Sequence, residues 1–539
     1  MKSNDWMDEP WYAEKLKARL YPKELVLGET LKRNAKRFPD RPAVIYQDRR
    51  RTYRELNARV NRLANSMLKL GIRKEDTIGI FSQNSDHYVE AGYAIAKTGC
   101  VFIPINFRLV GPEVEYILNY NEATAVFVDY PILDVILSIR GSLKAKHIIV
   151  MRPDGPLPEG TVSLDALVAS GSDSEPDVEV WEGDFVGLAQ TGGTTGRPKG
   201  VMITHRGACS IIYQVCYAHS YQETDRGLHA MPSYSSAGIA YDWGATLFHG
   251  GTIYIATLPP FDPVGILEII HREKINHLTF APIMLEFLIA FLDASPGKYD
   301  MSSVRTLISV GAPTPVRLRE AAVRHFGNVL YVEYSATEMG VATILKPDEV
   351  LKYPESCGRQ ALGQEIRIID DRGNELPRGQ IGEIAVAGIM ATSGYNKNPD
   401  ATRQALHGRF LGIGDMAYMD EEGYVYIVDR KSDMIISGGM NIYPAEIEAV
   451  MIGHPSIAEV AVIGVPDEQW GENVKAIIRL APGQVTTEAE IIEWCRGKMA
   501  GYRIPKSVDF IDDFPRTAAG KVQKSVLRKK YWEGAGRKI

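Results

Sequence analysis

The order of apolar and polar residues predicts alternating strands and helices over most of the chain. From His147 to about Glu338, short β-branched runs such as HIIVM, TIYIA and HLTFAP alternate with longer amphipathic runs such as PVRLREAAVRHF. Residues 36–135 repeat this style, with RPAVIY, DTIGIF, CVFIPI and TAVFVD as strands. Such alternation predicts a parallel sheet with helices on its faces. The most apolar run, LEFLIAFL (285–292), is predicted to be a buried core helix.

The pattern changes after Gly358, where paired strands replace the alternation. The segments EIRIIDDRGNELPRGQIGEIAVAG and DMAYMDEEGYVYIVDR each contain two strands around an acidic, glycine-containing turn, which predicts two hairpins. A small mixed α/β unit follows from about Ser432. One short connection near Arg430 to Asp433 joins it to the rest, so this unit could turn as a body. We therefore predict an N-terminal domain over 1–431 and a mobile C-terminal domain over 432–539.

Composition narrows the class of protein. The chain has 539 residues, 45% of them hydrophobic, which is enough for several cores. Its net charge of −6 argues against a nucleic-acid binder, because such proteins carry a basic face, and favours small-molecule partners. Five scattered cysteines contain no C-x-x-C pair that would suggest a cysteine-bound metal or a redox pair, and they fit a reducing cytosol. No uncharged apolar run approaches the ~18 residues of a membrane helix. We expect a soluble, cytoplasmic protein without a transmembrane segment, and leave a homodimer open.

The sequence TGGTTGRPKG (191–200) is typical of a loop that binds an anion. Glycines let backbone N–H groups approach phosphate oxygens, threonine hydroxyls add donors, and Lys199 adds positive charge. The loop is not a mononucleotide P-loop, because that motif needs lysine directly after glycine, whereas Arg197 and Pro198 stand between Gly196 and Lys199. Taken alone, the stretch could also be a glycine-rich turn that binds nothing.

Five segments in a fixed order resemble the acyl-adenylate-forming superfamily of acyl-CoA synthetases, peptide-synthetase adenylation domains and beetle luciferases. They are LAQTGGTTGRPKGVMITHRG, YVEYSATEMG (331–340), GIGDMAYMDEEGYVYIVDRKSDMI, SGGMNIYPAEIE and PRTAAGKVQK, and they cover most of the chain. The resemblance implies an α/β fold. Its large N-terminal domain has stacked, mostly parallel sheets, flanking helices and a β-hairpin subdomain, and its small mobile C-terminal domain is α+β. The chain is most similar to a free-standing fatty or aromatic acyl-CoA synthetase.

The resemblance implies two half-reactions that use ATP, Mg²⁺ and coenzyme A. A carboxylate attacks the α-phosphate of ATP to give acyl-AMP and pyrophosphate, and the thiol of CoA then displaces AMP. Transfers of this kind need positioning and charge stabilisation more than a protein nucleophile. The expected substrate is a fatty or other hydrophobic monocarboxylic acid. The alternatives are a benzoate- or cinnamate-type acid, or a non-catalytic nucleotide-binding protein on the same fold.

The resemblance also implies roles for individual residues. The expected catalytic residues are Lys521, Thr337, Glu338 and Lys199, and the expected metal ligands are Glu338 and Thr191. The nucleotide and CoA are expected to contact Thr191, Gly192, Gly193, Thr194, Thr195, Gly196, Gly311, Ala312, Pro313, Glu333, Tyr334, Asp415, Arg430, Ser437, Gly438 and Gly439. The acid is expected to contact Tyr234, Ser235, Gly238, Tyr241, Pro282, Val310 and Met339.

Four positions depart from the family pattern. Ser335 replaces the glycine of Y-G-x-T-E, and Ile413 replaces the threonine of T-G-D, both beside expected ligand positions. The expected hinge position carries Ser432 where Asp or Lys is common. Ser235 stands where related synthetases often carry a histidine near the acyl pocket, so the pocket entrance could be altered.

Several of these residues have other structural interpretations when each is considered alone. Asp415 and Asp429 could cap turns, and Tyr334 could be core at the end of a strand. Lys521 could be one of several solvated lysines. Asp242 could read a polar group of the substrate, but we expect it on the surface of a sheet or helix.

Overall fold

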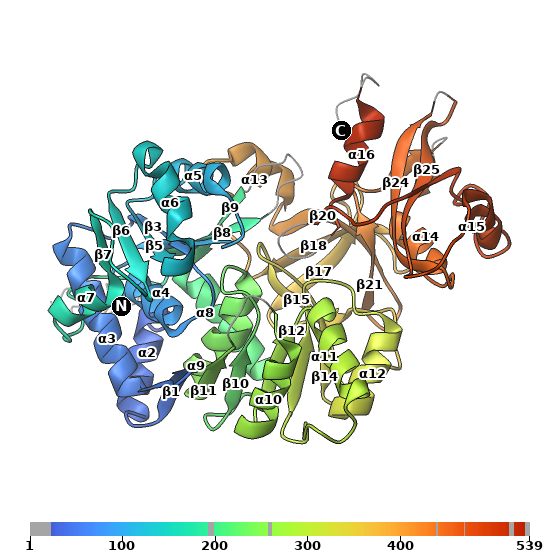
Figure 1. The fold of residues 1–539 in the computed structure, drawn as a ribbon. Coiled ribbons are helices and arrows are strands. Elements are labelled where there is room, and N and C mark those ends of the chain that lie inside the picture. Colours follow the sequence, from blue (N-terminus) through green and yellow to red (C-terminus); the bar gives the residue numbers. More distant parts are fainter. Residues whose placement is uncertain are drawn as a thin grey trace, which may run out of the picture. The chain divides into compact units, whose positions relative to one another are not determined.

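The computed structural model describes residues 23–191, 199–256, 261–437, 440–467, 469–516 and 522–533. The described chain forms two compact units, which Figure 1 shows as ribbons. The first contains the described residues of 23–191, 199–365 and 387–404, and the second contains those of 366–386 and 405–533. The second unit includes residues on both sides of the boundary predicted at 431–432, so that boundary stays a prediction. Among the described residues, no helix is long and apolar enough to cross a membrane.

One sheet of the first unit has the strand order β7-β6-β5-β3-β4-β8-β9. Its strands are β3 (Thr77–Phe81), β4 (Val101–Ile105), β5 (Ala125–Asp129), β6 (His147–Met151), β7 (Thr161–Ser163), β8 (Phe185–Thr191) and β9 (Lys199–Thr204). All neighbours are parallel except β8 and β9, which form an antiparallel pair. Strands β4 and β5 are buried throughout, as expected for the continuous apolar runs CVFIPI and TAVFVD in a covered parallel sheet.

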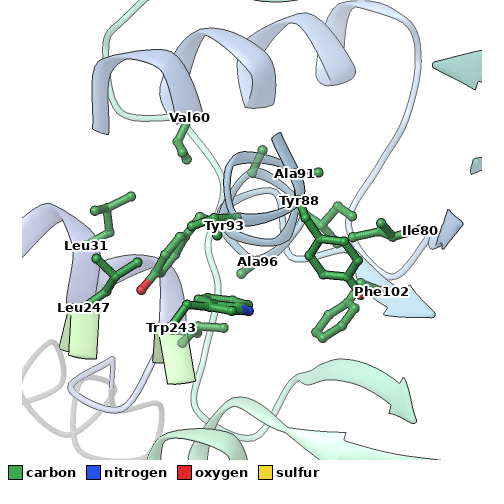
Figure 2. Close-up of a cluster of buried hydrophobic side chains, with 14 of the residues drawn as sticks. Leu31, Val60, Ile80, Tyr88, Ala91, Tyr93, Ala96, Phe102, Trp243 and Leu247 are labelled. Atoms are coloured by element: carbon green, nitrogen blue, oxygen red, sulfur yellow. The ribbon is translucent and has the colours of Figure 1, made fainter. Parts of the chain in front are cut away.

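Residues 23–170 also form helices and short turns. They are α2 (Leu27–Arg37), α3 (Tyr53–Lys69), α4 (Asp86–Lys97), α5 (Gly111–Tyr120), η2 (Tyr130–Ile132), α6 (Leu133–Ile139), η3 (Arg140–Ser142) and α7 (Leu164–Ser170). Thr52 and Glu55 form a capping box at the start of α3. Every residue of α4 is buried, and Figure 2 shows side chains from this helix packed among other buried residues. Tyr93 of α4 meets Trp243 edge to face, with ring centroids 5.4 Å apart.

A second set of strands in the first unit has the order β16-β15-β14-β13-β12-β10-β11-β1-β2. Their bounds are β1 (Pro42–Tyr46), β2 (Arg49–Thr52), β10 (Arg226–His229), β11 (Thr252–Ile255), β12 (His277–Phe280), β13 (Thr306–Ser309), β14 (Leu330–Ala336), β15 (Gly340–Leu345) and β16 (Gly358–Gln360). Strands β1 and β10 to β14 pair in parallel. The predicted strand and helix alternation is therefore confirmed here.

The described residues between 205 and 405 also form helices, one of them of the rare π type. They are α8 (His205–Ala218), the π-helix η4 (Gly238–Gly244), α9 (Ala245–His249), α10 (Pro263–Glu273), α11 (Pro282–Ala294), α12 (Val316–Phe326) and α13 (Pro399–Ala405). Figure 1 shows α10, α11 and α12 side by side.

The prediction of a buried core helix at LEFLIAFL is wrong in part. Helix α11 buries Leu285, Leu288 and Leu292, but Phe287 is 50% exposed and Phe291 is 41% exposed. The two phenylalanines lie one turn apart, on a face that the helix does not bury. Glu286 is the one polar residue of the run, and apolar residues fill all its other positions, so apolar periodicity does not identify the face that meets solvent.

The second unit contains two sets of strands, apart from the first two residues of β17 and the last two of β18, which belong to the first unit. The first set comprises β17 (Gln364–Ile369), β18 (Gly382–Gly388), β19 (Leu406–His407), β20 (Phe410–Met419) and β21 (Tyr424–Arg430). Strands β20 and β21 are antiparallel, which confirms the predicted second hairpin. The other set comprises β22 (Ile435–Ser437), β23 (Met440–Ile442), β24 (Ile457–Asp467), β25 (Gly471–Leu480) and β26 (Ser507–Phe510), with α14 (Pro444–Met451), α15 (Glu488–Cys495) and α16 (Lys524–Trp532). The predicted mixed α/β unit is therefore present.

Candidate active site

The segments expected to bind adenine and the acid follow the carboxyl ends of adjacent parallel strands. Residues 230–236 follow β10, Pro282 follows β12, 310–313 follow β13, and 337–339 follow β14. Because these strands are parallel, all of their carboxyl ends lie at one edge. Ligands of open α/β sheets bind at this edge. The fold thus collects at one edge residues that lie far apart in the sequence.

The turn between β14 and β15 carries Thr337 and Glu338. The hydroxyl of Ser236 donates to Thr337 Oγ1 at 3.3 Å. The Glu338 side chain is buried, and Oε1 accepts a hydrogen bond from the hydroxyl of Tyr395 at 3.0 Å. Gly340 ends the turn with a φ of +70°, a conformation that favours glycine. The turn therefore presents a hydroxyl and a carboxylate at the same edge.

The ends of the predicted phosphate loop are held by the β8–β9 pair. Thr191 and Lys199 face each other across the two strands. The Lys199 ammonium lies 5.2 Å from the ring centroid of Tyr395. The loop predictions Gly192, Gly193, Thr194, Thr195 and Gly196 lie outside the described residues.

Tyr395 is a candidate site residue that the sequence pattern did not indicate. It is buried and contacts both Glu338 and Lys199. Its segment, SGYNKNPD, is polar and shows no periodic pattern. The one signal in the sequence that could have indicated Tyr395 is the presence of a tyrosine in a segment rich in Gly, Asn and Pro.

The residues present are compatible with Mg²⁺. No group of three or more His, Cys, Asp or Glu residues that could hold a metal occurs in the part of the chain that is described. Mg²⁺ needs no such group when it binds nucleotides, because one or two carboxylates and the substrate phosphates complete its shell of oxygen ligands. The carboxylate of Glu338 and the hydroxyl of Thr191 are hard oxygen donors of the required kind.

The expected adenine site combines the loop after β13 with the end of β14. Gly311 has a φ of +93°, which only glycine adopts readily. Arg319 is buried and its Nε donates to the carbonyl oxygen of Thr314 at 2.9 Å, which fixes the loop that holds Gly311, Ala312 and Pro313. Tyr334 is half-buried beside a register shift in the β14–β15 pair, where Ser335 replaces the family glycine.

The carboxylate of Glu333 is engaged inside the protein. His219 Nε2 lies 2.7 Å from Glu333 Oε1, and the Tyr241 hydroxyl donates to Glu333 Oε2 at 2.6 Å. Burial raises the pKa of Tyr241, so its hydroxyl keeps its proton. A contact between Glu333 and adenine would therefore come from the backbone, and the Tyr241 hydroxyl is already engaged by the Glu333 carboxylate.

The residues expected to contact the acid are mostly apolar and buried. Gly238, Tyr241, Pro282, Val310 and Met339 are buried, and the half-buried Tyr234 meets Phe107 edge to face. Ser235 does not present a free hydroxyl. Its Oγ donates to the carbonyl oxygen of Pro232 at 2.7 Å and accepts from the backbone N–H of Gly238 at 3.1 Å. The serine found in place of the family histidine thus helps to begin the π-helix η4.

The expectation that Asp242 lies on a surface is wrong. Asp242 is 2% exposed, and its Oδ2 lies 2.9 Å from His229 Nδ1 and accepts from the backbone N–H groups of Ala230 and Met231. His229 Nε2 in turn lies 2.6 Å from Ser233 Oγ. Burial raises the pKa of Asp242, although His229 opposes this. Through Oδ2, the carboxylate holds the start of the loop that carries Tyr234 and Ser235.

Within the second unit, Asp415 and Arg430 are paired across β20 and β21. The Arg430 Nε lies 3.0 Å from Asp415 Oδ1. Asp429 does not cap a turn within its hairpin, but its Oδ2 accepts from the N–H of Ala445 in the first turn of α14, at 2.9 Å. Ser437 ends β22, opposite Met440 of β23. The predictions Gly438, Gly439 and Lys521 lie outside the described residues.

The expected hinge residue, Ser432, is held from the C-terminal helix. Arg528 of α16 donates from Nη1 to the carbonyl oxygen of Ser432 at 2.7 Å and pairs with Asp433. Lys524, one turn earlier, lies 2.7 Å from Glu448 of α14. Burial alone would lower the pKa of Lys524, but Glu448 and Asp429 outweigh it, so the pKa is raised. The helix that begins shortly after Lys521 is thus anchored twice.

Comparisons with known proteins agree with this architecture. A family model described as AMP-binding enzyme matches residues 31–396, and one described as AMP-binding enzyme C-terminal domain matches residues 446–521. The chain is 33% identical over 506 residues to a feruloyl-CoA synthase from Amycolatopsis sp, covering 94% of this chain and 99% of that protein. It is 34% identical over 491 residues to the long-chain-fatty-acid–CoA ligase FadD13 from Mycobacterium tuberculosis, covering 90% and 94%.

A solved structure leads to the same family. The anthranilate CoA ligase AuaEII in complex with anthranoyl-AMP superimposes with a TM-score of 0.85 and 28% identity, covering 95% of this chain and 98% of that one. Because a family model spans residues 31–396 and the relatives match nearly throughout, the chain belongs to the AMP-binding enzyme family, the acyl-adenylate-forming superfamily that its motifs predict.

Proposed function

We propose that the chain is an AMP-forming acyl-CoA synthetase that activates a hydrophobic monocarboxylic acid. In the first step a carboxylate oxygen attacks the α-phosphorus of ATP, the bond to the β,γ-diphosphate breaks, and acyl-AMP and pyrophosphate form. In the second step the CoA thiol, as its thiolate, attacks the acyl carbon and AMP leaves with the former carboxylate oxygen. The first step replaces an oxide leaving group with AMP, which makes the second step feasible.

One observation supports this proposal most directly. Glu338, the expected metal ligand, and Lys199, the expected phosphate ligand, both contact the side chain of Tyr395. A triphosphate with a bound Mg²⁺ needs a carboxylate and a cation at neighbouring positions, because the carboxylate holds the metal and the cation neutralises phosphate oxygens.

The other residues are given the roles that the family resemblance implies. Thr191 and the loop 192–198 would hold the departing diphosphate through hydroxyl and backbone donors. Thr337, with Ser236 beside it, would donate to the α-phosphate, and Tyr334 and the 311–313 loop would hold adenine. Asp415 would accept from both ribose hydroxyls, and Arg430 would contact the ribose or a phosphate. Mg²⁺, held by Glu338, would supply charge neutralisation between the phosphates.

Lys521 and the pantetheine contacts belong to different steps. Lys521 would neutralise charge between the acid and the α-phosphate in the first step, after which the C-terminal domain 432–539 would turn and withdraw it. Ser437, Gly438 and Gly439 would then line the path of the CoA thiol. Glycines allow the close backbone approach that such a narrow path requires.

The chemistry around the expected acid site supports a hydrophobic substrate. The carboxylate of Asp242 is bound by His229, Ala230 and Met231, and the hydroxyl of Ser235 is bound within its own turn. The remaining expected contacts are apolar or aromatic, as is usual for sites that take apolar ligands. Among the relatives, the feruloyl-CoA synthase is named for an aromatic acid and the long-chain-fatty-acid–CoA ligase for aliphatic acids. We favour an aliphatic acid.

A cytoplasmic location and a homodimer stay predictions.

A panel of acids tests the substrate. Purified protein would be given ATP, Mg²⁺ and CoA with medium- and long-chain fatty acids, hydroxycinnamic acids, benzoates and short dicarboxylic acids, and pyrophosphate release would be measured. We expect the highest kcat/KM for a fatty acid and the lowest for the dicarboxylic acids. A preference for an aromatic acid would replace the aliphatic proposal. ATP binding without pyrophosphate release from any acid would favour a non-catalytic nucleotide-binding protein.

A further inference from the structure

We propose that Tyr395 is a positioning residue that holds the metal carboxylate and the phosphate lysine in a fixed relation. The proposal rests on the proposed function, which gives Glu338 and Lys199 their roles. These two side chains come from different strands of the first unit, Glu338 from the turn after β14 and Lys199 from the start of β9. They must nevertheless act on one triphosphate.

The backbone around Tyr395 joins these two strands. Met202 N donates to the carbonyl oxygen of Gly394 at 2.9 Å, and Asn396 N donates to that of Gly200 at 2.8 Å, so the segment pairs with β9. On its other side, Thr392 N donates to the carbonyl oxygen of Glu338 at 2.7 Å. Residues 392–396 are therefore bound both to the lysine strand and to the glutamate turn.

The side chain of Tyr395 repeats this link. Its hydroxyl donates to Glu338 Oε1 at 3.0 Å, while its ring centroid lies 5.2 Å from Lys199 Nζ, within the range of a cation–π contact. Tyr395 is buried, and its own N–H donates to Thr402 Oγ1 at 3.0 Å. One rigid aromatic side chain thus contacts both charged groups.

Such a link matters because phosphoryl transfer depends on position. A displacement of about 1 Å in a group that holds the reacting atoms lowers the rate strongly. Without the hydroxyl of Tyr395, Glu338 loses one fixed donor. Without the ring, Lys199 also loses the face against which it lies. The two losses can be separated by choosing the replacement.

Variants of Tyr395, a matched control and one unreactive ligand test the proposal. Tyr395→Phe removes only the hydroxyl, Tyr395→Leu removes both contacts, and Tyr120→Phe is the matched control. Tyr120 donates its hydroxyl to the carbonyl oxygen of Asn396 at 3.2 Å, so it binds the same segment without touching Glu338 or Lys199. The ligand is α,β-methylene-ATP, which cannot release pyrophosphate, and its Kd is measured by calorimetry with Mg²⁺ and in EDTA.

We expect Tyr395→Phe to weaken binding of the magnesium complex about tenfold, as for loss of a hydrogen bond to a charged group, and to leave binding in EDTA unchanged. Tyr395→Leu should weaken binding of the nucleotide both with Mg²⁺ and in EDTA. Tyr120→Phe should change neither affinity. In the Glu338→Gln background, Tyr395→Phe should cause no further loss, because coupled residues are not additive. If Tyr395→Leu fails to fold, the Phe variant and this double-variant cycle decide the question.

Two results separate the inference from the function on which it rests. If wild-type protein forms acyl-CoA with release of pyrophosphate but Tyr395→Phe binds the magnesium complex as wild type does, the positioning role of Tyr395 is wrong and the proposed function stands. An equal loss of nucleotide affinity in Tyr395→Phe with and without Mg²⁺ would also overturn the positioning role. If wild-type protein releases no pyrophosphate with any acid, the proposed function itself fails.

Discussion

Asp242 Oδ2 lies 2.9 Å from His229 Nδ1, and both side chains are buried. Through Ser233, this pair fixes the loop that precedes η4. We expect Asp242→Ala to lower the free energy of unfolding by about 3 kcal/mol or more, because His229 and two backbone N–H groups lose their acceptor in the interior. Urea unfolding measures the change, with Asp262→Ala, which removes an exposed helix cap, as a milder control. If Asp262→Ala lowers the free energy of unfolding as much as Asp242→Ala does, the buried Asp242–His229 pair has no larger effect on stability than an exposed helix cap.

Ser235 gives a prediction about the family histidine. Because its hydroxyl bonds both Pro232 and Gly238 at the start of η4, Ser235→Ala should cost about 1 kcal/mol of stability. Ser235→His should lower kcat/KM rather than raise it, since imidazole cannot make both short local bonds. Steady-state kinetics with the preferred acid and a thermal melt measure these effects. A faster, equally stable histidine variant would show that the hydroxyl is dispensable.

His205 should make stability depend on pH. Its Nδ1 accepts from the N–H of Leu27, and burial lowers its pKa from 6.5 to about 4. An unfolded chain takes up this proton near pH 6.5 while the folded protein does not. The stability present above pH 6.5 is therefore lost as pH falls toward about 4, by roughly 3 kcal/mol in all. His205→Asn keeps an acceptor but does not titrate, so it should remove that part of the pH dependence of urea unfolding. Identical curves for both proteins would refute the assignment.

Arg528 should protect the connection that we expect to act as a hinge. It binds the carbonyl oxygen of Ser432 and the carboxylate of Asp433. Arg528→Met should speed tryptic cleavage after Arg430 and Lys431 several-fold, because local opening governs proteolysis. Lys529→Met, which changes an exposed neighbour on the same helix, is the control. The prediction fails if both variants are cut at the wild-type rate.

Lys521 separates the two half-reactions. If the C-terminal domain turns between them, Lys521→Ala should slow acyl-AMP formation sharply, while thioester formation from supplied acyl-AMP continues at nearly the wild-type rate. Rapid-quench measurement of each half-reaction gives the two rates. Equal losses in both would argue against a domain rotation that withdraws this lysine.

The sequence predicted those features that depend on local pattern. The runs HIIVM, TIYIA and HLTFAP are strands β6, β11 and β12, because short β-branched runs between amphipathic helices fit a covered parallel sheet. The family motifs also identified segments that follow the carboxyl ends of neighbouring strands. Each of these signals is carried by residues that lie close together in the sequence.

The features that the sequence did not predict depend on contacts between distant segments. The burial of Asp242 depends on His229 and on the loop that they share, and the place of Tyr395 depends on a segment that joins β9 to Glu338. The exposed face of α11 depends on which neighbours cover it. None of these has a local period or spacing, so residue pattern alone cannot show them.

The fate of one oxygen atom tests the central claim, which is activation through acyl-AMP. The protein would be given its preferred acid labelled with ¹⁸O in both carboxylate oxygens, together with ATP, Mg²⁺ and CoA, and the phosphorus products would be analysed by mass spectrometry. Because the carboxylate attacks the α-phosphorus, we predict AMP that carries one ¹⁸O atom, together with unlabelled pyrophosphate. Formation of ADP with ¹⁸O in orthophosphate would show an acyl-phosphate route and contradict the account.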